Sequence, residues 1–549
     1  MSFNLGVIHD AIADRIPDRE MITFRDRRLT WRDVQSRTRR LAHLLRDAGL
    51  GCRRERAELA PWESGQDHLA LYLYNGNEYI EGMLGAFKAR VAPFNVNYRY
   101  VAEELLYVLK DARTRAILYH ASFAPLLREV LPKLPAMALL LQVDDGSGEP
   151  LLPGAVDYES ALAGASDAPL DLPCTPDDLY ILYTGGTTGM PKGVLWRQED
   201  IFFGAMGGRI LGGAAVGSID EVAERSLGGE AFRMLPAPPF MHGAAHWASF
   251  ITFHQGGTVC IPENPRSLDP DDIWRTVERE RIFTLSIVGD AFARPLLDQL
   301  RTKTYDVSTL KILGSGGAIL SAPYKEAFLA AIPGLVIFDG FGSSETGAQG
   351  SAVSMAGVDS KQGAFKMDEQ TVLLDEGMSR KLASGDAGAL GWVARMGYVP
   401  LGYLGDEAKT RRTYPVIDGV RYAVPGDRAQ LSPEGEVIVF GRDSVCINSG
   451  GEKIFAEEVE QALKHHDAVY DTVVTGTPSE RWGEQVTALV VLRAGDKPSE
   501  DVLRDTAARH IARYKLPKAF IFVDAIVRAP SGKPDYRWAK ETARKALGV

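Results

Sequence analysis

A segment rich in glycine and threonine is the part of the sequence best suited to bind phosphate. Residues 183–193 read Tyr-Thr-Gly-Gly-Thr-Thr-Gly-Met-Pro-Lys-Gly and follow an apolar run at residues 179–182 that predicts a strand. Glycines let a backbone approach a ligand closely, and exposed N–H groups and threonine hydroxyls can donate to phosphate oxygens. Lys192 adds positive charge, but no Ser or Thr follows it, so the segment is not a Walker A loop. A phosphate-binding loop and a flexible surface hairpin would both fit these residues.

Four charged residues farther along the chain have side chains suited to the rest of a nucleotide. Glu345 follows a glycine-rich stretch at residues 340–342, and Mg²⁺ takes only one or two protein carboxylates when phosphates supply its other ligands. The carboxylate of Asp427 suits two ribose hydroxyls, and the guanidinium of Arg442 offers a rigid fork of donors. Lys533 lies in a Pro-Ser-Gly-Lys loop near the end of the sequence. Taken singly, each could instead be a solvated loop residue, a turn cap or a surface ion pair.

Short apolar runs alternate with amphipathic stretches, and these are the elements that must position the charged residues. Residues 69–73 and 116–119 predict strands, and the apolar residues of 80–88 between them have helical spacing. Residues 310–313 and 336–338 predict two more strands, each followed directly by a tight glycine-rich turn. This alternation predicts an α/β fold with helices on the sheet faces, and ligands approach such sheets at the carboxyl ends of the strands.

The clearest domain boundary lies near Gly441. Residues 436–440 before it predict a strand, and residues 457–464 after it have helical periodicity. The remaining residues predict a small α/β unit of ordinary domain size. We therefore expect an N-terminal domain at residues 1–440, a hinge at 441–445 and a C-terminal domain at 446–549.

The order of these motifs resembles that of the adenylate-forming superfamily, which includes acyl- and aryl-CoA synthetases, luciferases and amino-acid adenylation domains. The resemblance covers nearly the whole chain, and the matching segments are residues 92–105, 183–193, 340–347, 426–427, 441–442 and 530–533. It implies a large N-terminal domain of layered sheets and helices plus a small mobile C-terminal α/β domain. Phe341 and Ser344 replace the usual Tyr and Thr, and Ser444 stands where the hinge usually has Lys or Asp.

The resemblance also implies a role for each matching residue. The catalytic residues that it implies are Lys533, Glu345 and Lys192. The residues that it implies for ATP are Thr184, Gly185, Gly186, Thr187, Thr188, Gly189, Lys192, Asp339, Gly340, Phe341, Gly342, Ser343, Ser344, Asp427, Arg442 and Lys533. Mg²⁺ would contact Thr184 and Glu345. The acyl group and coenzyme A would contact His242, Gly289, Gly314, Gly316, Gly317, Gly450 and Gly451.

The reaction implied by this resemblance joins a carboxylic acid to coenzyme A, using ATP and releasing AMP and pyrophosphate. An amino acid is a poor candidate. The amino-acid adenylation domains that this sequence resembles usually place an Asp shortly after the matching Phe, where it pairs the substrate ammonium, whereas no acidic residue follows Phe240 before Glu263. A buried ammonium without a partner is costly. Small residues at 287–292 and 314–318 leave room for a long or bulky apolar group, although tight helix–strand packing would also explain them. Several motifs resemble those of actinobacterial-type synthetases for steroid side-chain acids, and a medium- or long-chain fatty acid is the alternative.

Two other functions fit the same motifs. An acyl-AMP ligase that loads a carrier protein would share every ATP motif. A non-catalytic ligand-binding protein with the same fold is the other alternative, and the presence of Glu345, Asp427, Arg442 and Lys533 counts against it.

Composition excludes some partners. The formal net charge of −10 argues against nucleic acid, whose binding needs a basic surface. The four cysteines are far apart and predict neither disulfides nor a zinc site, and the first residues do not resemble a signal peptide, so we expect a cytoplasmic protein. Residues 234–262 contain no charged side chain, and their prolines and histidines favour a buried active-site wall over a membrane span. A peripheral membrane contact and a homo-oligomer stay open.

Overall fold

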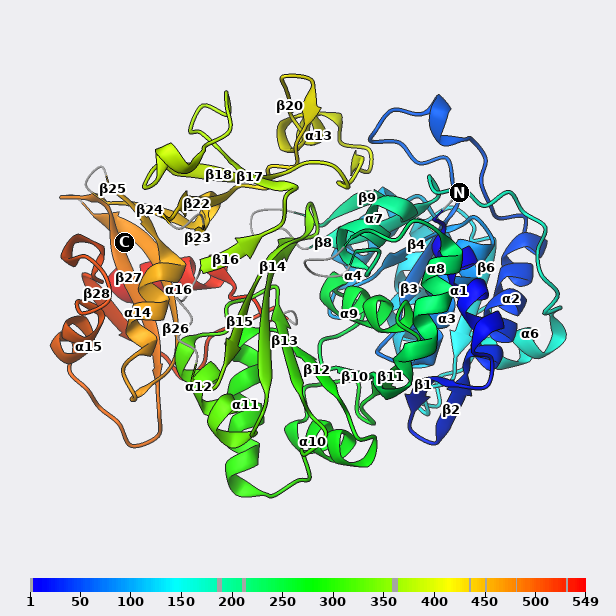
Figure 1. Ribbon diagram of the computed structural model, residues 1–549, viewed down its shortest axis with the longest axis horizontal. Coiled ribbons are helices and arrows are strands. Elements are labelled where there is room, and N and C mark those ends of the chain that lie inside the picture. The colour runs from blue at the N-terminus through cyan, green and yellow to red at the C-terminus, as the bar shows by residue number, and fades with distance from the viewer. Residues whose placement is uncertain are drawn as a thin grey trace.

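Two large sheets, one small sheet and a two-stranded ribbon organise the chain. The computed structural model describes residues 3–184, 190–209, 214–357, 364–433, 436–449, 452–479, 481–529 and 532–549. Within these residues the strands form sheets of eight, thirteen, five and two strands. Figure 1 shows the eight-stranded sheet towards one end of the molecule, the thirteen-stranded sheet through its middle and the five-stranded sheet at the opposite end.

The eight-stranded sheet is covered by helices on both faces. In β3 (His68–Tyr72), Leu69 and Leu71 pack into one apolar core with α1, α2 and α3, whereas Ala70 and Tyr72 pack into a second core with α4 and α5. A parallel strand that is buried on both faces is apolar at successive positions, which explains the apolar run that predicted it. The sheet order is β19-β9-β8-β4-β3-β5-β6-β7.

The other bounds of this layer are as follows. The strands are β4 (Ala92–Asn95), β5 (Thr114–His120), β6 (Leu139–Val143), β7 (Val156–Asp157), β8 (Leu179–Thr184), β9 (Lys192–Arg197) and β19 (Gly402–Tyr403). The helices are α1 (Leu5–Arg15), α2 (Trp31–Asp47), α3 (Asn77–Lys88), α4 (Ala102–Asp111), α5 (Ala124–Val130), α6 (Tyr158–Gly164), α7 (Gln198–Ala205), α8 (Ile219–Ser226), α9 (Gly243–Phe253) and α13 (Glu407–Thr413).

The thirteen-stranded sheet runs β17-β18-β22-β23-β16-β15-β14-β13-β12-β10-β11-β1-β2. Its strands β10 to β14 pair in parallel, and Leu285, Leu313 and Ile337 from three of them share a core with α10, α11 and α12. The helix bounds are α10 (Pro270–Arg279), α11 (Gly289–Thr302) and α12 (Ala322–Ala331). The strand bounds are β1 (Glu20–Phe24), β2 (Arg27–Thr30), β10 (Arg233–Pro236), β11 (Thr258–Ile261), β12 (Thr284–Ile287), β13 (Ile312–Gly316), β14 (Val336–Ser343), β15 (Gly347–Met355), β16 (Ala364–Met367), β17 (Thr371–Leu374), β18 (Leu390–Arg395), β22 (Asp427–Leu431) and β23 (Val437–Arg442); β20 (Val416–Ile417) and β21 (Val420–Arg421) form the ribbon.

The five-stranded sheet is built from the last part of the chain. The chain leaves the thirteen-stranded sheet at Arg442 and enters the small sheet at Cys446, after a single turn of 3₁₀ helix at Asp443–Val445. The bounds are β24 (Cys446–Ser449), β25 (Glu452–Phe455), α14 (Ala456–Lys464), β26 (Val469–Ser479), β27 (Gly483–Leu492), α15 (Glu500–Ala507), β28 (Ala519–Phe522) and α16 (Tyr536–Leu547). The change of sheet falls in the segment predicted as a hinge, and the hinge itself stays a prediction.

The expected α/β class is confirmed, but the two glycine-rich turns were predicted wrongly. The strand expected at residues 310–313 is β13, which continues through Gly316, and the strand expected at residues 336–338 is β14, which continues through Ser343. The glycines stay in the strands because Gly316 pairs with Gly340 in the parallel ladder, so both backbones remain extended. Glycine therefore marks close approach of two strands here and not the point at which they end.

The uncharged stretch at residues 234–262 does not form one long helix. It supplies most of β10, the whole of the 11-residue helix α9, and β11. Among the residues that the structure describes, no helix is both long and apolar enough to cross a membrane. All four cysteines are free thiols.

Candidate active site

The phosphate-loop segment spans a β-hairpin. β8 and β9 are antiparallel, and Thr184 at the end of β8 pairs with Lys192 at the start of β9. The predicted ligands between them lie outside the described residues; they are Gly185, Gly186, Thr187, Thr188 and Gly189. The structure therefore gives the two ends of the loop, which lie side by side because Thr184 and Lys192 are register partners.

Asn95 ties this hairpin to the segment before α9. Its side-chain oxygen accepts from the Tyr183 N–H at 2.7 Å, and its amide nitrogen donates to the Tyr183 carbonyl at 2.9 Å and to the Met241 carbonyl at 2.7 Å. The Asn95 side chain is buried, so these bonds are shielded from water. One amide thus fixes the end of β8 against the residue next to His242.

Glu345 lies in the turn after β14 and is positioned by a tyrosine from a distant segment. Tyr403 in β19 donates to Glu345 Oε1 at 2.9 Å, and β19 reaches this place because it pairs with β9. Glu345 is only 8% exposed. Beside it, Lys192 Nζ lies 3.5 Å from Asp406 Oδ2. Burial would lower the pKa of Lys192, but nearby acidic groups, Asp406 among them, raise it, so Lys192 is a cation.

Asp427 and Arg442 form an ion pair across two neighbouring strands. They are register partners in the antiparallel pair β22–β23, and Arg442 Nε lies 2.9 Å from Asp427 Oδ1. Burial raises the pKa of Asp427, and the charge of Arg442 opposes that shift. Arg442 also donates to the Pro425 carbonyl at 3.1 Å, which fixes the guanidinium over the glycine turn before Asp427.

Lys533 lies with these groups although it belongs to the last part of the chain. The surrounding protein and the charge of Arg442 lower the pKa of Lys533, whereas the negative charges of Glu345 and Asp427 raise it. The side chain is nonetheless exposed to solvent. The structure thus brings Lys533, Glu345, Asp427 and Arg442 close enough together for their charges to act on one another.

The predicted acyl wall lies next to the same strands. Gly289 begins α11 and donates its N–H to Ser315 Oγ at 3.1 Å, which joins α11 to β13. Gly314 and Gly316 are in β13, directly beside β14, and Gly317 follows. His242 precedes α9, and desolvation and the charge of Lys533 lower its pKa to about 3, so its imidazole is neutral. Within the described part of the chain, His242 Nε2 is buried without a hydrogen-bond partner.

Not all of the predicted ATP-binding residues of β14 and the turn after it lie close to Lys533, Asp427 and Arg442. Asp339 is buried and paired with Lys325 Nζ at 2.8 Å, so the structure does not bring its carboxylate to the other predicted residues. The ring of Phe341 packs on Phe365 with centroids 5.3 Å apart. Trp196 donates to the Ser344 carbonyl at 2.9 Å. Gly340 and Gly342 lie in the strand, and the hydroxyl of Ser343 bonds to that of Thr346 at 3.0 Å.

Two predicted residues of the coenzyme A face, Gly450 and Gly451, also lie outside the described residues. They fall between β24 and β25, whose ends Ser449 and Glu452 pair as a hairpin. The structure gives no position for a channel there.

The donor set around Glu345 suits a magnesium ion that arrives with a nucleotide. Among the described residues, no group of three or more His, Cys, Asp and Glu side chains could hold a metal. Mg²⁺ needs only one or two protein oxygens when phosphates and waters complete its octahedron. The predicted pair, Thr184 and Glu345, supplies one hydroxyl and one carboxylate, which fits such an ion and not a permanently bound one.

Sequence reasoning missed three residues of this site: Tyr403, Asp406 and Glu457. Tyr403 and Asp406 reach the site only through the pairing of β19 with β9, more than two hundred residues away in sequence, and no local pattern announces that pairing. Glu457 lies in the first turn of α14, within electrostatic range of Lys533 and Arg442. A glutamate in the first turn of a helix is ordinary, so nothing in the sequence distinguished it.

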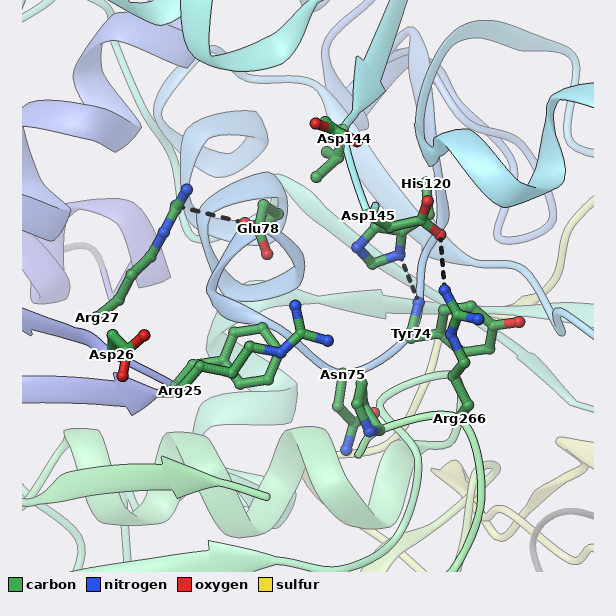
Figure 2. Close-up of a pocket in the computed structure, with 13 residues that line it drawn as sticks. Arg25, Asp26, Arg27, Tyr74, Asn75, Glu78, His120, Asp144, Asp145 and Arg266 are labelled. Carbon is green, nitrogen blue, oxygen red and sulfur yellow. Dashed lines mark hydrogen bonds and ion pairs between the residues drawn. The ribbon is translucent and has the colours of Figure 1, made fainter. Parts of the chain in front are cut away.

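A separate cavity of about 250 Å³ lies where loops at the carboxyl ends of β3, β5 and β6 meet the β1–β2 hairpin. Figure 2 shows two ion pairs among the charged residues that line it, in which Arg27 lies 3.5 Å from Glu78 and Arg266 lies 3.5 Å from Asp145. None of the residues predicted to bind ATP, acid or coenzyme A lines it. We assign it no role in the chemistry.

Comparisons with known proteins agree with this arrangement. Residues 10–404 match the family model of the AMP-binding enzyme, and residues 458–533 match that of the AMP-binding enzyme C-terminal domain. The medium-chain acyl-CoA ligase Mig of Mycobacterium avium is 51% identical over 99% of this chain and 98% of its own length. The 3-oxocholest-4-en-26-oate–CoA ligase of Rhodococcus rhodochrous is 40% identical over 98% and 96%. The crystal structure of the anthranilate CoA ligase AuaEII with anthranoyl-AMP superposes with a TM-score of 0.83 at 20% identity, over 100% of this chain and 98% of that one.

Proposed function

Because this chain belongs to the family of AMP-binding enzymes, we propose that it is an ATP-dependent acyl-CoA ligase that works through an acyl-adenylate. The observation that supports this proposal is the grouping of Lys533 with Glu345, Asp427 and Arg442, in which Arg442 Nε lies 2.9 Å from Asp427 Oδ1 and Lys533 is close enough to feel the charge of all three. The relatives named above are CoA ligases along almost the whole chain, which favours transfer to coenzyme A over a carrier protein or simple ligand binding.

In the first half-reaction the carboxylate oxygen of the acid attacks the α-phosphorus of ATP, and pyrophosphate leaves. Asp427 would hold the ribose hydroxyls, and Arg442 would keep Asp427 ionised and oriented. Lys533 would offset negative charge on the attacking carboxylate and the α-phosphate, and Lys192 would do so on the departing phosphates. When bound, Mg²⁺ would neutralise phosphate charge, and Thr184 and Glu345 would hold it.

In the second half-reaction the thiol sulfur of coenzyme A attacks the acyl carbonyl, and AMP leaves with the bonding electrons. We propose that the domain division is 1–440, 441–445 and 446–549, and that the small domain turns on the hinge between the two steps. A few residues at the ends of elements can absorb such a change. The hairpin at Gly450 and Gly451 would then face coenzyme A.

The acid is proposed to be a medium- or long-chain fatty acid or a bulky steroid side-chain acid. The relatives from M. avium and R. rhodochrous are named for a medium-chain acid and for 3-oxocholest-4-en-26-oate, respectively. The glycines of β13 leave space beside β14 for an apolar group. In the described part of the chain, His242 Nε2 is buried without a hydrogen-bond partner. It is a polar atom that could contact the carboxylate group of the acid.

The test is direct. Enzyme, Mg²⁺, ATP and coenzyme A are mixed with fatty, aromatic and steroid acids side by side, and acyl-CoA is identified by mass spectrometry. We expect acyl-CoA and AMP with at least one fatty or steroid acid, and loss of pyrophosphate exchange in Lys533→Ala. Adenylate without thioester would favour the carrier-protein alternative, and full activity of Lys533→Ala would refute the site.

A further inference from the structure

The loop that carries Lys533 rests directly on the start of α11. Gly532 has φ +77°, and a Cβ there would lie 3.3 Å from Ala291 Cβ and 3.3 Å from the Val288 carbonyl oxygen. Gly532 is buried, and Val288 and Ala291 belong to the segment expected to line the acyl pocket. The residue before Lys533 therefore packs closely against the backbone of Val288 and the small side chain of Ala291, which leaves no room for a side chain at position 532.

A buried carboxylate holds the base of the same loop. Arg528 donates from Nη1 to the Gly532 carbonyl at 2.8 Å, and from Nη2 and Nε to Asp471 at 2.7 and 3.1 Å. Burial would raise the pKa of Asp471, but the charges of Lys464 and Arg528 lower it. Asp471 is thus an anion that orients Arg528, and Arg528 orients the residue before Lys533.

Two side chains of α11, Arg294 and Asp290, contact residues of β26 and α14 in the C-terminal part of the chain. Arg294 donates to the Tyr470 carbonyl at 2.6 Å, stacks 3.8 Å from the Tyr470 ring centroid, and lies 3.5 Å from Asp471. Asp290 Oδ2 accepts from Lys464 Nζ at 2.8 Å, while its Oδ1 accepts from the Ser321 N–H at 2.7 Å. The side chains of Asp290 and Lys464 are 5% and 13% exposed, so water screens this pair weakly.

We propose that Asp290 and Arg294 of α11, together with Lys464 and Asp471, are positioning residues that hold Lys533 over the nucleotide for adenylation. The proposal rests on the proposed role of Lys533. The Asp290–Lys464 ion pair and the stacking of Arg294 on Tyr470 join α11 to the small sheet and its helix α14. Arg528 then connects Asp471 to the loop that carries Lys533. The stabilisation that a positive charge gives to a transition state falls as the charge moves away from it. A shift of about 1 Å in the position of a catalytic group can slow a reaction roughly 10²-fold.

Asp290→Asn is the sharpest variant. Asparagine keeps an oxygen for the Ser321 N–H, but it places an amide nitrogen opposite Lys464, which removes both the charge and the hydrogen-bond acceptor that Lys464 needs. We expect pyrophosphate exchange to fall roughly 10-fold or more because Lys533 is less well held. Transfer from a supplied acyl-adenylate to coenzyme A should be unchanged, since that step is proposed not to use Lys533.

Further variants separate positioning from general damage. Lys464→Met should lose adenylation like Asp290→Asn, the double variant should lose no more than either single one, and Lys464→Arg should restore most of the rate. Lys515→Met is the matched control, because it breaks the Lys515–Glu458 pair at 2.6 Å within the small sheet's own helices and loops. That control should leave both half-reactions as in the wild type.

Equal loss of both half-reactions in Asp290→Asn, additive losses in the double variant, or no loss at all would overturn the proposal. The proposed function fails in a different way. If Lys533→Ala keeps normal pyrophosphate exchange, the catalytic role of the lysine is wrong, whatever the Asp290 variants do.

Discussion

The orientation of Glu345 depends on a hydrogen bond from Tyr403, and deleting one oxygen atom would remove that bond. Tyr403→Phe deletes the hydroxyl that donates to Glu345 Oε1 at 2.9 Å and leaves the ring in place. We expect adenylation to slow by roughly 10-fold and the Mg²⁺ concentration needed for half the maximal rate to rise, because positioned groups of this kind are typically worth 10–100-fold. Pyrophosphate exchange measured across a Mg²⁺ titration checks both.

Tyr414→Phe is the control for this prediction. Tyr414 packs beside Tyr403 with ring centroids 5.9 Å apart, and in the described part of the chain its hydroxyl is buried without a hydrogen-bond partner. Removing that hydroxyl should leave the Mg²⁺ dependence unchanged. If both variants lose activity alike, the effect comes from packing and Tyr403 does not position Glu345.

At the level of single residues, the sequence identified the groups whose chemistry is distinctive. Glu345, Asp427, Arg442 and Lys533 each stand within a few residues of a glycine in the sequence, and such short motifs are local features. Tyr403 and Glu457 could not be found in this way, because their contacts depend on the pairing of β19 with β9 and on the docking of α14. Asp339 illustrates the opposite error, since its place next to Gly340 suggested a ligand and its carboxylate pairs with Lys325.

At the scale of secondary-structure elements, β13 and β14 limit the width of the proposed acyl pocket. A Cβ on Gly314 would have only the Leu285 carbonyl oxygen nearby, at 4.0 Å, so a side chain there would project into space and not into the core. Gly314→Leu should therefore preserve stability and fill the proposed pocket. We expect kcat/KM for long or bulky acids to fall roughly 10-fold or more while a short acid such as butyrate is spared or favoured, since lost or gained pocket volume is worth about 1–3 kcal/mol per group.

The measurement is the ratio of kcat/KM values for a long and a short acid, with the thermal midpoint as a check on folding. An unchanged ratio in a stably folded Gly314→Leu protein would place the acyl group elsewhere.

The same strands show the limit of sequence reasoning about elements. Their apolar runs predicted them correctly, but whether Gly316 and Gly340 end a strand or extend it is decided by the neighbouring strand.

At the scale of the whole molecule, the two parts of the chain meet at a carboxyl group that nothing in the sequence marked. Glu457 of α14 lies against Gly441, where a Cβ would be 2.5 Å from Glu457 Oε2, and Gly441 has φ +129°. Burial, together with the charges of Glu460 and Asp427, raises the pKa of Glu457 to about 8, and Arg442 and Lys533 oppose that shift. The small sheet thus docks beside Asp427 and Arg442, the residues proposed to bind the ribose, with a carboxyl group of raised pKa at the junction.

This raised pKa fixes the sign of a pH effect on stability. Below the ordinary glutamate pKa of 4.5, Glu457 is protonated in both the folded and unfolded states and costs nothing. As the pH rises from there to about 8, the unfolded chain releases the proton and the folded protein retains it, so the free energy of unfolding falls. Glu457→Gln cannot ionise, so it should match the wild type at pH 5 and be more stable by on the order of 1–2 kcal/mol at pH 8.5, after allowance for solvent screening.

Thermal midpoints at the two pH values measure this difference. Glu541→Gln, an exposed change on α16 of the same unit, should follow the wild type at both. A gain that is equal at pH 5 and pH 8.5 would mean that the amide simply packs better, and no gain would mean that Glu457 ionises freely. A gain confined to alkaline pH would show that Glu457 keeps its proton in the folded protein, as its burial and the neighbouring charges of Glu460 and Asp427 require.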